Sequence, residues 1–226
     1  TAQITALQAQ QAAAPVATVE AVIQQAQEAT EHIDLDESET RVLIDAQLRD
    51  AGWEADSVTL THKSGARPAK GRCMAISEWP TTSGPADYVL FVGLVPVGVV
   101  EAKRKRKNVA GAIEQAKRYS RDYALKGDPA ADGSPWDEYI IPFLFATNGR
   151  PFLRQLKAAS GIWFLDARRS TNHPRALEGW YTPQGLLDLL GQDIAEADTR
   201  LQTESSEYLP LRDYQHAAIA AVEERI

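Results

Sequence analysis

The sequence predicts an α/β domain in which a mixed β-sheet is flanked by helices. Two observations carry this prediction. Amphipathic helical stretches alternate with short apolar runs along the chain, and two of those runs lie close enough together to form a hairpin. The composition of the 226 residues, 44% hydrophobic and 24% charged, is that of a globular protein and excludes wholesale disorder.

Each element has its own local signal. Residues 1–30 are rich in Ala and Gln and predict a lead-in whose helix, 19–30, cannot support a core. A firmer helix begins near Asp36 or Ser38, where acids crowd the first turn, and stops at Gly52. The rest of the chain predicts a strand (53–62), a Gly/Pro/Lys/Arg loop (64–71), a hairpin (86–92 and 96–103), a helix (108–125), two strands (139–147 and 162–166) and a helix (182–190).

This pattern places one domain at 31–191, a linker at 192–209 and the beginning of a further domain at 210–226. The chain starts without methionine and ends in mid-pattern, so we expect it to be a piece of a longer protein. Its longest apolar stretch, Tyr88–Val100, is broken by glycine and proline and is too short to span a bilayer, so no membrane partner is predicted. The single cysteine, Cys73, excludes an internal disulfide and fits a reducing cytosol.

Positive charge is concentrated in one segment of an acidic chain. The net charge is −7, yet residues 101–126 hold nine basic and three acidic side chains, a local net charge of 9 − 3 = +6. Such a patch is typical of a nucleic-acid contact, and a solvated face is the alternative. The nine basic residues are Lys103, Arg104, Lys105, Arg106, Lys107, Lys117, Arg118, Arg121 and Lys126.

The chemistry is expected in the hairpin. If its turn centres on Leu94, Asp87 lies seven residues before the turn and Glu101 seven after it, so the two face each other across the ladder. Lys103 stands two residues beyond Glu101 and shares its face. Behind these three, the same face would carry the core residues Val89, Phe91, Val97 and Val99.

Two facing carboxylates at the end of an apolar ladder repel each other, and a divalent cation removes that repulsion. Hard oxygen ligands suit Mg²⁺. A neighbouring lysine can orient or help deprotonate an attacking water, or offset charge that develops on a phosphate. The alternative is that Asp87 and Glu101 merely end their strands, with Lys103 paired to one of them.

The run from Gly84 to Gly93, followed by Val100-Glu101-Ala102-Lys103, resembles the PD-(D/E)xK nuclease motif. More narrowly, it resembles the N-terminal endonuclease domain of the restriction (R) subunit of type I restriction-modification enzymes. Three further segments match that family in order: the first-helix acidic motif that ends in Thr-Arg (37–41), the Q-x-x-x-Y motif (115–119) and the strand that follows it (145–149). The likeness covers roughly residues 36–190 and implies a restriction-endonuclease-like core.

The resemblance implies a role for each site residue. Asp87 and Glu101 would be metal ligands for Mg²⁺, helped by the carbonyl of Ala102, and Lys103 the catalytic lysine. Glu37 would be the helix acid that supports the site; Glu39 is its rival, and a partner of the helix dipole is the alternative for Glu37. The Q-x-x-x-Y pair, which bears on DNA positioning and cleavage, would be Gln115 and Tyr119. Sequence-independent phosphate contacts are expected from Arg104, Lys105, Arg106, Lys107 and Arg118.

The tail resembles the Q-motif that opens superfamily 2 helicase domains, in which arginine and glutamine read adenine. Its nucleotide-binding residues would be Arg212, Tyr214 and Gln215, and an ordinary amphipathic helix is the alternative. No G-x-x-x-x-G-K-[ST] phosphate loop occurs in the chain, so ATP is expected to serve only motor domains outside it.

The sequence therefore predicts the endonuclease domain of a type I restriction subunit, which would hydrolyse unmethylated double-stranded DNA. Its partners would be methyltransferase (M) and specificity (S) subunits in the cytoplasm of a bacterium or archaeon. The first alternative is a helicase-linked repair or recombination nuclease with the same fold. The second is a non-catalytic docking module that ties the motor to its partner subunits.

Overall fold

The computed structural model describes residues 37–103, 109–125, 129–203 and 210–223. The expected lead-in at 1–30, with its helix at 19–30, lies outside these residues. Among the helices that are described, none is long and apolar enough to cross a membrane.

The described residues contain one seven-stranded mixed sheet in which the spatial order of the strands follows the chain order. The pairs β1–β2 and β4–β5 are parallel, and the other four pairs are antiparallel. The predicted fold class is therefore confirmed. The strands are β1 (Glu54–Ala55), β2 (Cys73–Thr81), β3 (Gly84–Val92), β4 (Val95–Ala102), β5 (Phe143–Thr147), β6 (Ile162–Asp166) and β7 (Arg175–Ala176).

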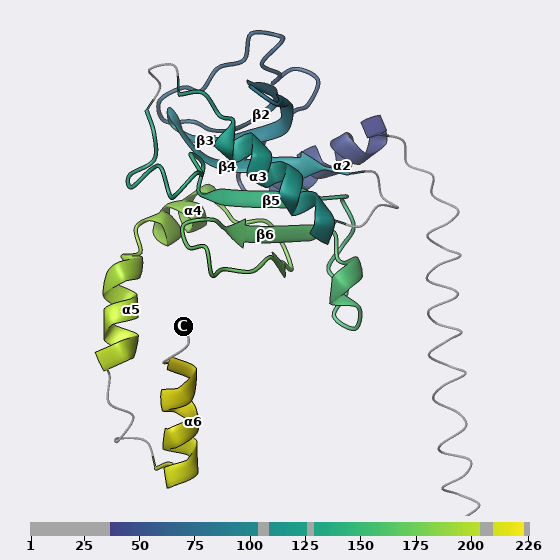
Figure 1. Ribbon diagram of the computed structural model, residues 1–226. Coiled ribbons are helices and arrows are strands. Elements are labelled where there is room, and N and C mark those ends of the chain that lie inside the picture. The colour runs from purple at the N-terminus through teal and green to yellow at the C-terminus, as the bar shows by residue number, and fades with distance from the viewer. Residues whose placement is uncertain (1–36, 104–108, 126–128, 204–209, 224–226) are drawn as a thin grey trace, which may run out of the picture. The chain divides into compact units, whose positions relative to one another are not determined.

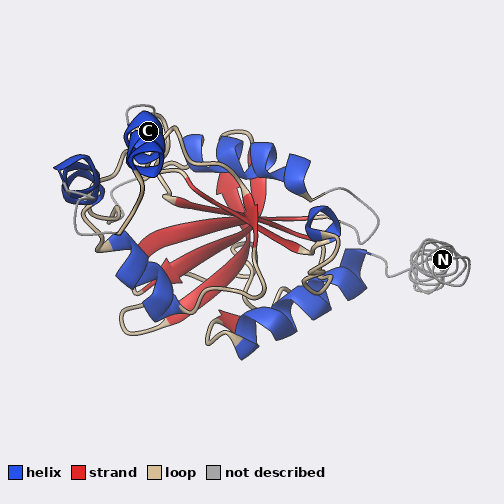
Figure 2. Cartoon of the chain, turned by 90° about the horizontal axis from the view of Figure 1, so that it is seen from below, coloured by secondary structure: helices blue, strands red, loops and turns tan. Residues whose placement is uncertain are grey.

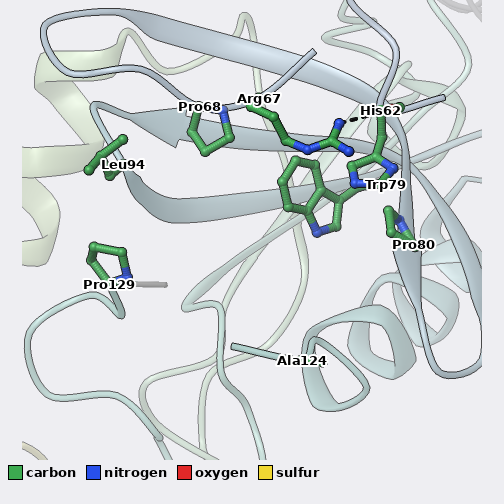
Figure 3. A pocket seen from close by; sticks show the side chains of 8 residues that line it. All are labelled: His62, Arg67, Pro68, Trp79, Pro80, Leu94, Ala124 and Pro129. Atoms are coloured by element: carbon green, nitrogen blue, oxygen red, sulfur yellow. Dashed lines mark hydrogen bonds between the residues drawn. The ribbon is translucent and has the colours of Figure 1, made fainter. Parts of the chain in front are cut away.

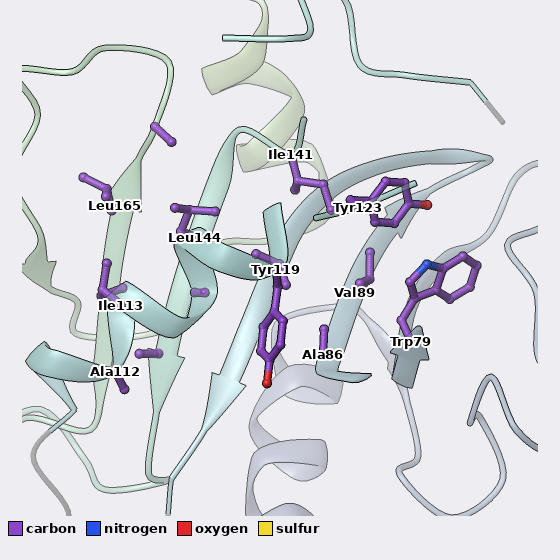
Figure 4. Packing of buried hydrophobic residues seen from close by; sticks show 14 of the residues in the cluster. Trp79, Ala86, Val89, Ala112, Ile113, Tyr119, Tyr123, Ile141, Leu144 and Leu165 are labelled. Atoms are coloured by element: carbon purple, nitrogen blue, oxygen red, sulfur yellow. The ribbon is translucent and has the colours of Figure 1, made fainter. Parts of the chain in front are cut away.

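Helices cover both faces of this sheet (Figures 1 and 2). One core forms between the sheet and α3, and it holds Ile113 and Tyr119 of the helix together with Val89 and Leu144 of the strands (Figure 4). The other core holds residues of α2 and α4 on the opposite face. The helical segments are α2 (Glu37–Asp50), η1 (Ala110–Ala112), α3 (Ile113–Arg121), η2 (Lys157–Ala159), α4 (Pro183–Leu190), α5 (Ile194–Thr203) and α6 (Asp213–Glu223).

Helix α4 confirms its sequence signal, because the Thr182 hydroxyl accepts a hydrogen bond from the Gly185 amide at 3.0 Å and caps the first turn. The expected linker, in contrast, is helical at α5. Asp193 caps that helix by accepting from the Glu196 amide at 2.9 Å, and the alanine, glutamate and leucine that follow are good helix formers.

The strand expected at 53–62 is wrong beyond its first residues. The Asp56 carboxylate accepts hydrogen bonds from the amides of Val58 and Thr59 at 2.9 and 3.0 Å, so the chain turns after Ala55 and Val58 is 75% exposed. Two strands, β2 and β7, were not predicted. The helix expected at 108–125 is the shorter η1–α3 pair, and the strand expected at 139–147 begins only at Phe143, after a proline.

The hairpin of β3 and β4 turns through Gly93 and Leu94, with Val92 paired to Val95. Gly93 has φ +61°, the left-handed conformation that tight hairpin turns require. A β-bulge follows, because Phe91 pairs with Pro96 whereas Leu90 pairs with Gly98, which leaves Val97 as an extra residue. Val97 therefore lies in the core with α2, and its predicted position beside Val89, Phe91 and Val99 is wrong.

Candidate active site

The two predicted acids lie across from each other where β3 begins and β4 ends. Tyr88 pairs with Val100, so the next position of the ladder places Asp87 opposite Glu101. The amide of Ala102 donates to Asp87 Oδ2 at 2.8 Å, which fixes one oxygen of this carboxylate. Glu101 is only 2% exposed.

Burial changes the acidity of both groups. It raises the pKa of Glu101 to about 7, and the negative charge of Asp87 contributes in the same direction. Burial also raises the pKa of Asp87, although the Ala102 amide and the Arg41 guanidinium oppose that rise. The pair is therefore costly to ionise fully unless positive charge is added between the two groups.

A chain of polar contacts joins Glu101 to α3. The ammonium of Lys103 forms an ion pair with Glu101 Oε1 and donates to Gln115 Oε1 at 2.9 Å. The amide of Gln115 in turn donates to the Tyr119 hydroxyl at 2.6 Å, and burial raises the pKa of that phenol to about 12. The Lys103 backbone amide donates to the Thr147 carbonyl at 2.7 Å, so β5 fixes the lysine where β4 ends.

Arg41, for which no role was predicted, reaches the site from α2. Its guanidinium donates to Asp87 Oδ1 at 2.9 Å and lies 3.7 Å from Glu78 Oε1. One turn later on α2, Asp45 Oδ1 accepts from the Tyr88 hydroxyl at 3.0 Å, beside Asp87 in the chain. Two successive turns of the helix therefore bind two successive residues of β3, which sets the helix in register with the strand. The sequence signal was that Arg41 shares a helical face with the core residues of α2.

The structure describes the two candidate acids of α2, Glu37 and Glu39, only in part. Glu37 begins α2, one turn before Arg41, and its side chain lies outside the described residues. Glu39 is exposed. The choice between the two as the supporting acid stays a prediction.

The structure describes only some residues of the predicted basic patch. Arg104, Lys105, Arg106, Lys107 and Lys126 lie outside the described residues. On α3 and its flank, Lys117 pairs with Glu114 at 2.7 Å and Arg121 with Glu138 at 2.8 Å, so their charges are offset locally. Arg118 is exposed on the flank of the helix next to Gln115.

Of the predicted nucleotide-binding residues, Tyr214 and Gln215 lie in the first turn of α6, and Arg212 directly precedes the helix. Gln215 Oε1 accepts from the Arg212 amide at 3.0 Å, so this side chain caps its own helix, and Tyr214 is 66% exposed. Their role in ATP binding stays a prediction. Asn148, at the end of β5, serves a turn, because its side chain accepts from the Arg150 amide at 3.2 Å and Gly149 has φ +72°.

Comparison with known proteins shows the family of the chain. Residues 54–190, more than half of the chain, match the family model described as the second domain of the type I restriction enzyme EcoKI endonuclease subunit. The chain is also 40% identical, over 228 aligned positions, to the type I restriction enzyme EcoKI endonuclease subunit of Escherichia coli (strain K12). The chain belongs to the type I restriction endonuclease subunit family. The alignment covers 86% of this chain and 19% of that relative, so the chain spans about a fifth of the relative's length. No solved structure matches the chain.

The site of this endonuclease-subunit chain fits a divalent cation. Glu101 Oε2 is buried and has no hydrogen-bond partner among the described residues. Such an atom is costly to bury, and a cation would satisfy it. The atoms available are all hard oxygens, as Mg²⁺ prefers. The described residues contain no group of three or more His, Cys, Asp or Glu side chains that could hold a metal, so further ligands would have to be a carbonyl such as that of Ala102, water or a phosphate.

Proposed function

We propose that this domain is the Mg²⁺-dependent endonuclease of a type I restriction R subunit. It would hydrolyse phosphodiester bonds of unmethylated double-stranded DNA after motor domains outside the chain have translocated the DNA with ATP. The observation that carries the proposal is the pair of Asp87, which is partly buried, and Glu101, which is buried, opposed across two strands and flanked by Lys103. An ordinary strand end does not set a buried carboxylate against a second one and leave one of its oxygens without a partner.

Asp87 and Glu101 would hold the cation, with the carbonyl of Ala102 as a third ligand. Bound there, Mg²⁺ would lower the pKa of a water molecule and offset negative charge on the phosphate. In the reaction the water oxygen forms a bond to phosphorus, one bridging P–O bond breaks, and the water proton passes to solvent as the leaving oxygen is protonated. The protein has to supply position and positive charge for this exchange.

Lys103 would supply both position and positive charge. Its ammonium is held between Glu101 and Gln115, so it stands beside the carboxylates without occupying Glu101 Oε2. From there it can orient the attacking water or donate to a phosphate oxygen. Gln115 and Tyr119 limit the freedom of the ammonium through the 2.9 and 2.6 Å hydrogen bonds that join them in series.

Sequence specificity and assembly would come from partners. The relative's name describes one subunit of a type I restriction enzyme, and we extend that assembly to this chain. An S subunit would recognise the DNA site, M subunits would protect host DNA by methylation, and this domain would cut without reading bases. The described residues contain no group of His and Cys side chains of the zinc-finger kind.

The proposal is tested in the full-length subunit assembled with its M and S partners. Asp87→Asn and Lys103→Met should each lower the rate of DNA cleavage by at least about a hundredfold and leave the rate of ATP hydrolysis unchanged. Glu54→Gln is the matched control, because it removes an exposed carboxylate that pairs only with Arg72. Cleavage at the wild-type rate by either site variant would exclude the assignment.

A second measurement separates a nuclease from a docking module. Titration of the 226-residue chain with Mn²⁺ or Ca²⁺ in a calorimeter should give binding that Glu101→Gln weakens strongly and Glu54→Gln does not. A docking module predicts no binding of either ion.

A further inference from the structure

The loop that precedes β2 carries positive charge that no acid in its own segment offsets. Between Asp56 and Glu78 the sequence contains no acidic residue, while residues 62–72 contain Lys63, Arg67, Lys70 and Arg72. All four are exposed. Arg72 forms an ion pair with Glu54, whereas no described carboxylate pairs with any of the other three. We call residues 62–72 the basic loop.

Hydrogen bonds within the basic loop hold its backbone in one shape. The Ala66 amide donates to the Thr61 carbonyl at 3.0 Å, and the Ser64 amide donates to the Thr61 hydroxyl at 2.9 Å. One guanidinium nitrogen of Arg67 donates to the carbonyls of His62 and Ala66 at 2.9 and 2.7 Å, which leaves its other N–H groups available. The cationic groups therefore stand on a fixed loop rather than on a free tail, so binding a ligand costs less ordering entropy.

A hollow of about 380 Å³ opens beside this loop (Figure 3). None of the residues that line it is acidic, and that volume lies within the roughly 300–1,000 Å³ of small-ligand sites. The His62 ring meets the Trp79 indole edge-on, with centroids 4.8 Å apart, and Arg67 lies at the rim. The lining residues are His62, Arg67, Pro68, Trp79, Pro80, Leu94, Ala124 and Pro129.

The hollow adjoins the candidate active site. Trp79 pairs with Ala86 in the β2–β3 ladder, and Ala86 is the residue before Asp87. The indole also stacks on Tyr123 at 6.2 Å, one helical turn beyond Tyr119 of the site. The far end of the basic loop lies at the hairpin turn, where the Gly93 amide donates to the Arg72 carbonyl at 2.8 Å. A strand of DNA whose phosphodiester lies at Asp87 and that follows β3 would therefore reach the Trp79 end of the hollow first and the far end of the basic loop several nucleotides later.

The charges around this route favour a polyanion. The nearest acid in the chain, Glu78, has the Arg41 guanidinium 3.7 Å from its carboxylate. On α3, by contrast, Lys117 and Arg121 are already paired with acids. Among the described residues, a phosphate can therefore engage Lys63, Arg67 and Lys70 of the basic loop, and Arg118 of α3, without breaking an ion pair.

We propose that the basic loop and the hollow beside Trp79 form a DNA-backbone contact that seats the substrate strand next to the bond to be cut. Lys63, Arg67 and Lys70 bind phosphates of one strand without reading sequence, and the hollow accommodates the deoxyribose between them. This inference rests on the proposed nuclease function, since it names how the substrate of that site is held.

The test is DNA binding by the 226-residue chain in EDTA, where no metal-dependent cleavage occurs, measured by fluorescence anisotropy over 50–200 mM salt. Lys63→Gln/Lys70→Gln should weaken binding roughly tenfold and lower the slope of log K against log salt by about 1.8, because each phosphate contact contributes about 0.9. Arg67→Gln should lower the slope by about 0.9. Arg72→Gln is the matched control: it makes the same charge change in the same loop, but its side chain is already paired with Glu54.

Equal slopes for the double lysine variant and the wild type would overturn the inference, as would a wild-type chain that does not bind DNA. A loss of DNA affinity of the same size in Arg72→Gln would overturn it too, because it would show that DNA responds to the overall positive potential of the loop rather than to contacts with particular side chains. The double variant leaves the loop's hydrogen bonds intact, so it decides the question even if Arg67→Gln fails to fold. Failure of the proposed function looks different: the lysine variants would still change the slope, but the assembled enzyme would show no dependence of cleavage on Asp87.

Discussion

The buried carboxyl of Glu101 should destabilise the metal-free domain at alkaline pH, and Glu101→Gln should remove that penalty. The pKa of Glu101 is raised from 4.5 to about 7 in the folded chain. The folded state therefore binds a proton more tightly than the unfolded state, so the free energy of unfolding falls as pH rises from about 4.5 to about 7. A pKa difference of about 2.5 corresponds to about 3 kcal/mol, which is fully lost above pH 7.

The variant removes this penalty, because glutamine cannot ionise. The raised pKa of Glu101 already includes the attraction of the Lys103 ammonium, so that attraction is not subtracted again. The expectation at pH 8.5 is a domain more stable than the wild type by about 3 kcal/mol. At pH 4.5, where the wild-type carboxyl is protonated, the two proteins should differ by less than about 1 kcal/mol.

Urea denaturation of both proteins in EDTA at pH 4.5 and pH 8.5 measures these differences. Addition of Mn²⁺ at pH 8.5 to about a thousand times its dissociation constant should then reverse the order, because a cation that binds only the folded wild type adds about 4.1 kcal/mol at that concentration. A variant less stable than the wild type at pH 8.5 without metal would refute the reasoning, since the carboxylate would then stabilise the fold rather than strain it.

Three further changes test the contacts around the acids. Arg41→Ala, but not Arg41→Lys, should weaken Mn²⁺ binding about tenfold in calorimetry, because it removes the guanidinium that holds Asp87 Oδ1 in place; a Mn²⁺ affinity equal to that of the wild type would show that Arg41 does not position Asp87. Tyr119→Phe deletes the hydroxyl that accepts from Gln115 and should slow DNA cleavage by the assembled enzyme about fivefold without a change in Mn²⁺ affinity, so a parallel loss of affinity would contradict it. Asp45→Ala strands the buried hydroxyl of Tyr88 and should lower the free energy of unfolding by about 3 kcal/mol in urea, whereas a loss below about 1 kcal/mol would mean that water replaces the carboxylate.

Local patterns sufficed where a local cause sets the structure. The cap at Thr182 predicted α4, and the apolar run at 162–166 predicted β6 with its observed bounds. They failed where a side chain competed with the backbone, as at Asp56, whose carboxylate ends β1 after two residues. Strand β2 was missed because Glu78 and Pro80 interrupt its apolar pattern, and Glu78 has φ +53° there.

The candidate site was predictable as far as its residues lie within one hairpin and one helix. Lys103 and Gln115 are twelve positions apart, and their contact could be anticipated from the family motif alone. The Arg41–Asp87 contact spans 46 positions and depends on how α2 crosses the sheet, which no local pattern specifies. The basic loop was predicted as a loop. The proposal that it binds DNA also depends on the ion pairs that Lys117 and Arg121 of α3 form with acids, and these pairs appear only in three dimensions.

The alignment of the two acids was predicted correctly for an incomplete reason. The turn passes through Gly93 and Leu94, and continuing the register of Val92 with Val95 would set Asp87 against Val100 rather than Glu101. The bulge at Val97 adds the one residue that corrects this. Its signal is in the sequence, because Pro96 cannot donate to a regular ladder and a Cβ on Gly98 would lie 3.0 Å from the Leu90 side chain. The alignment of Asp87 with Glu101 is therefore encoded in Pro96-Val97-Gly98, outside the motif that predicts the chemistry.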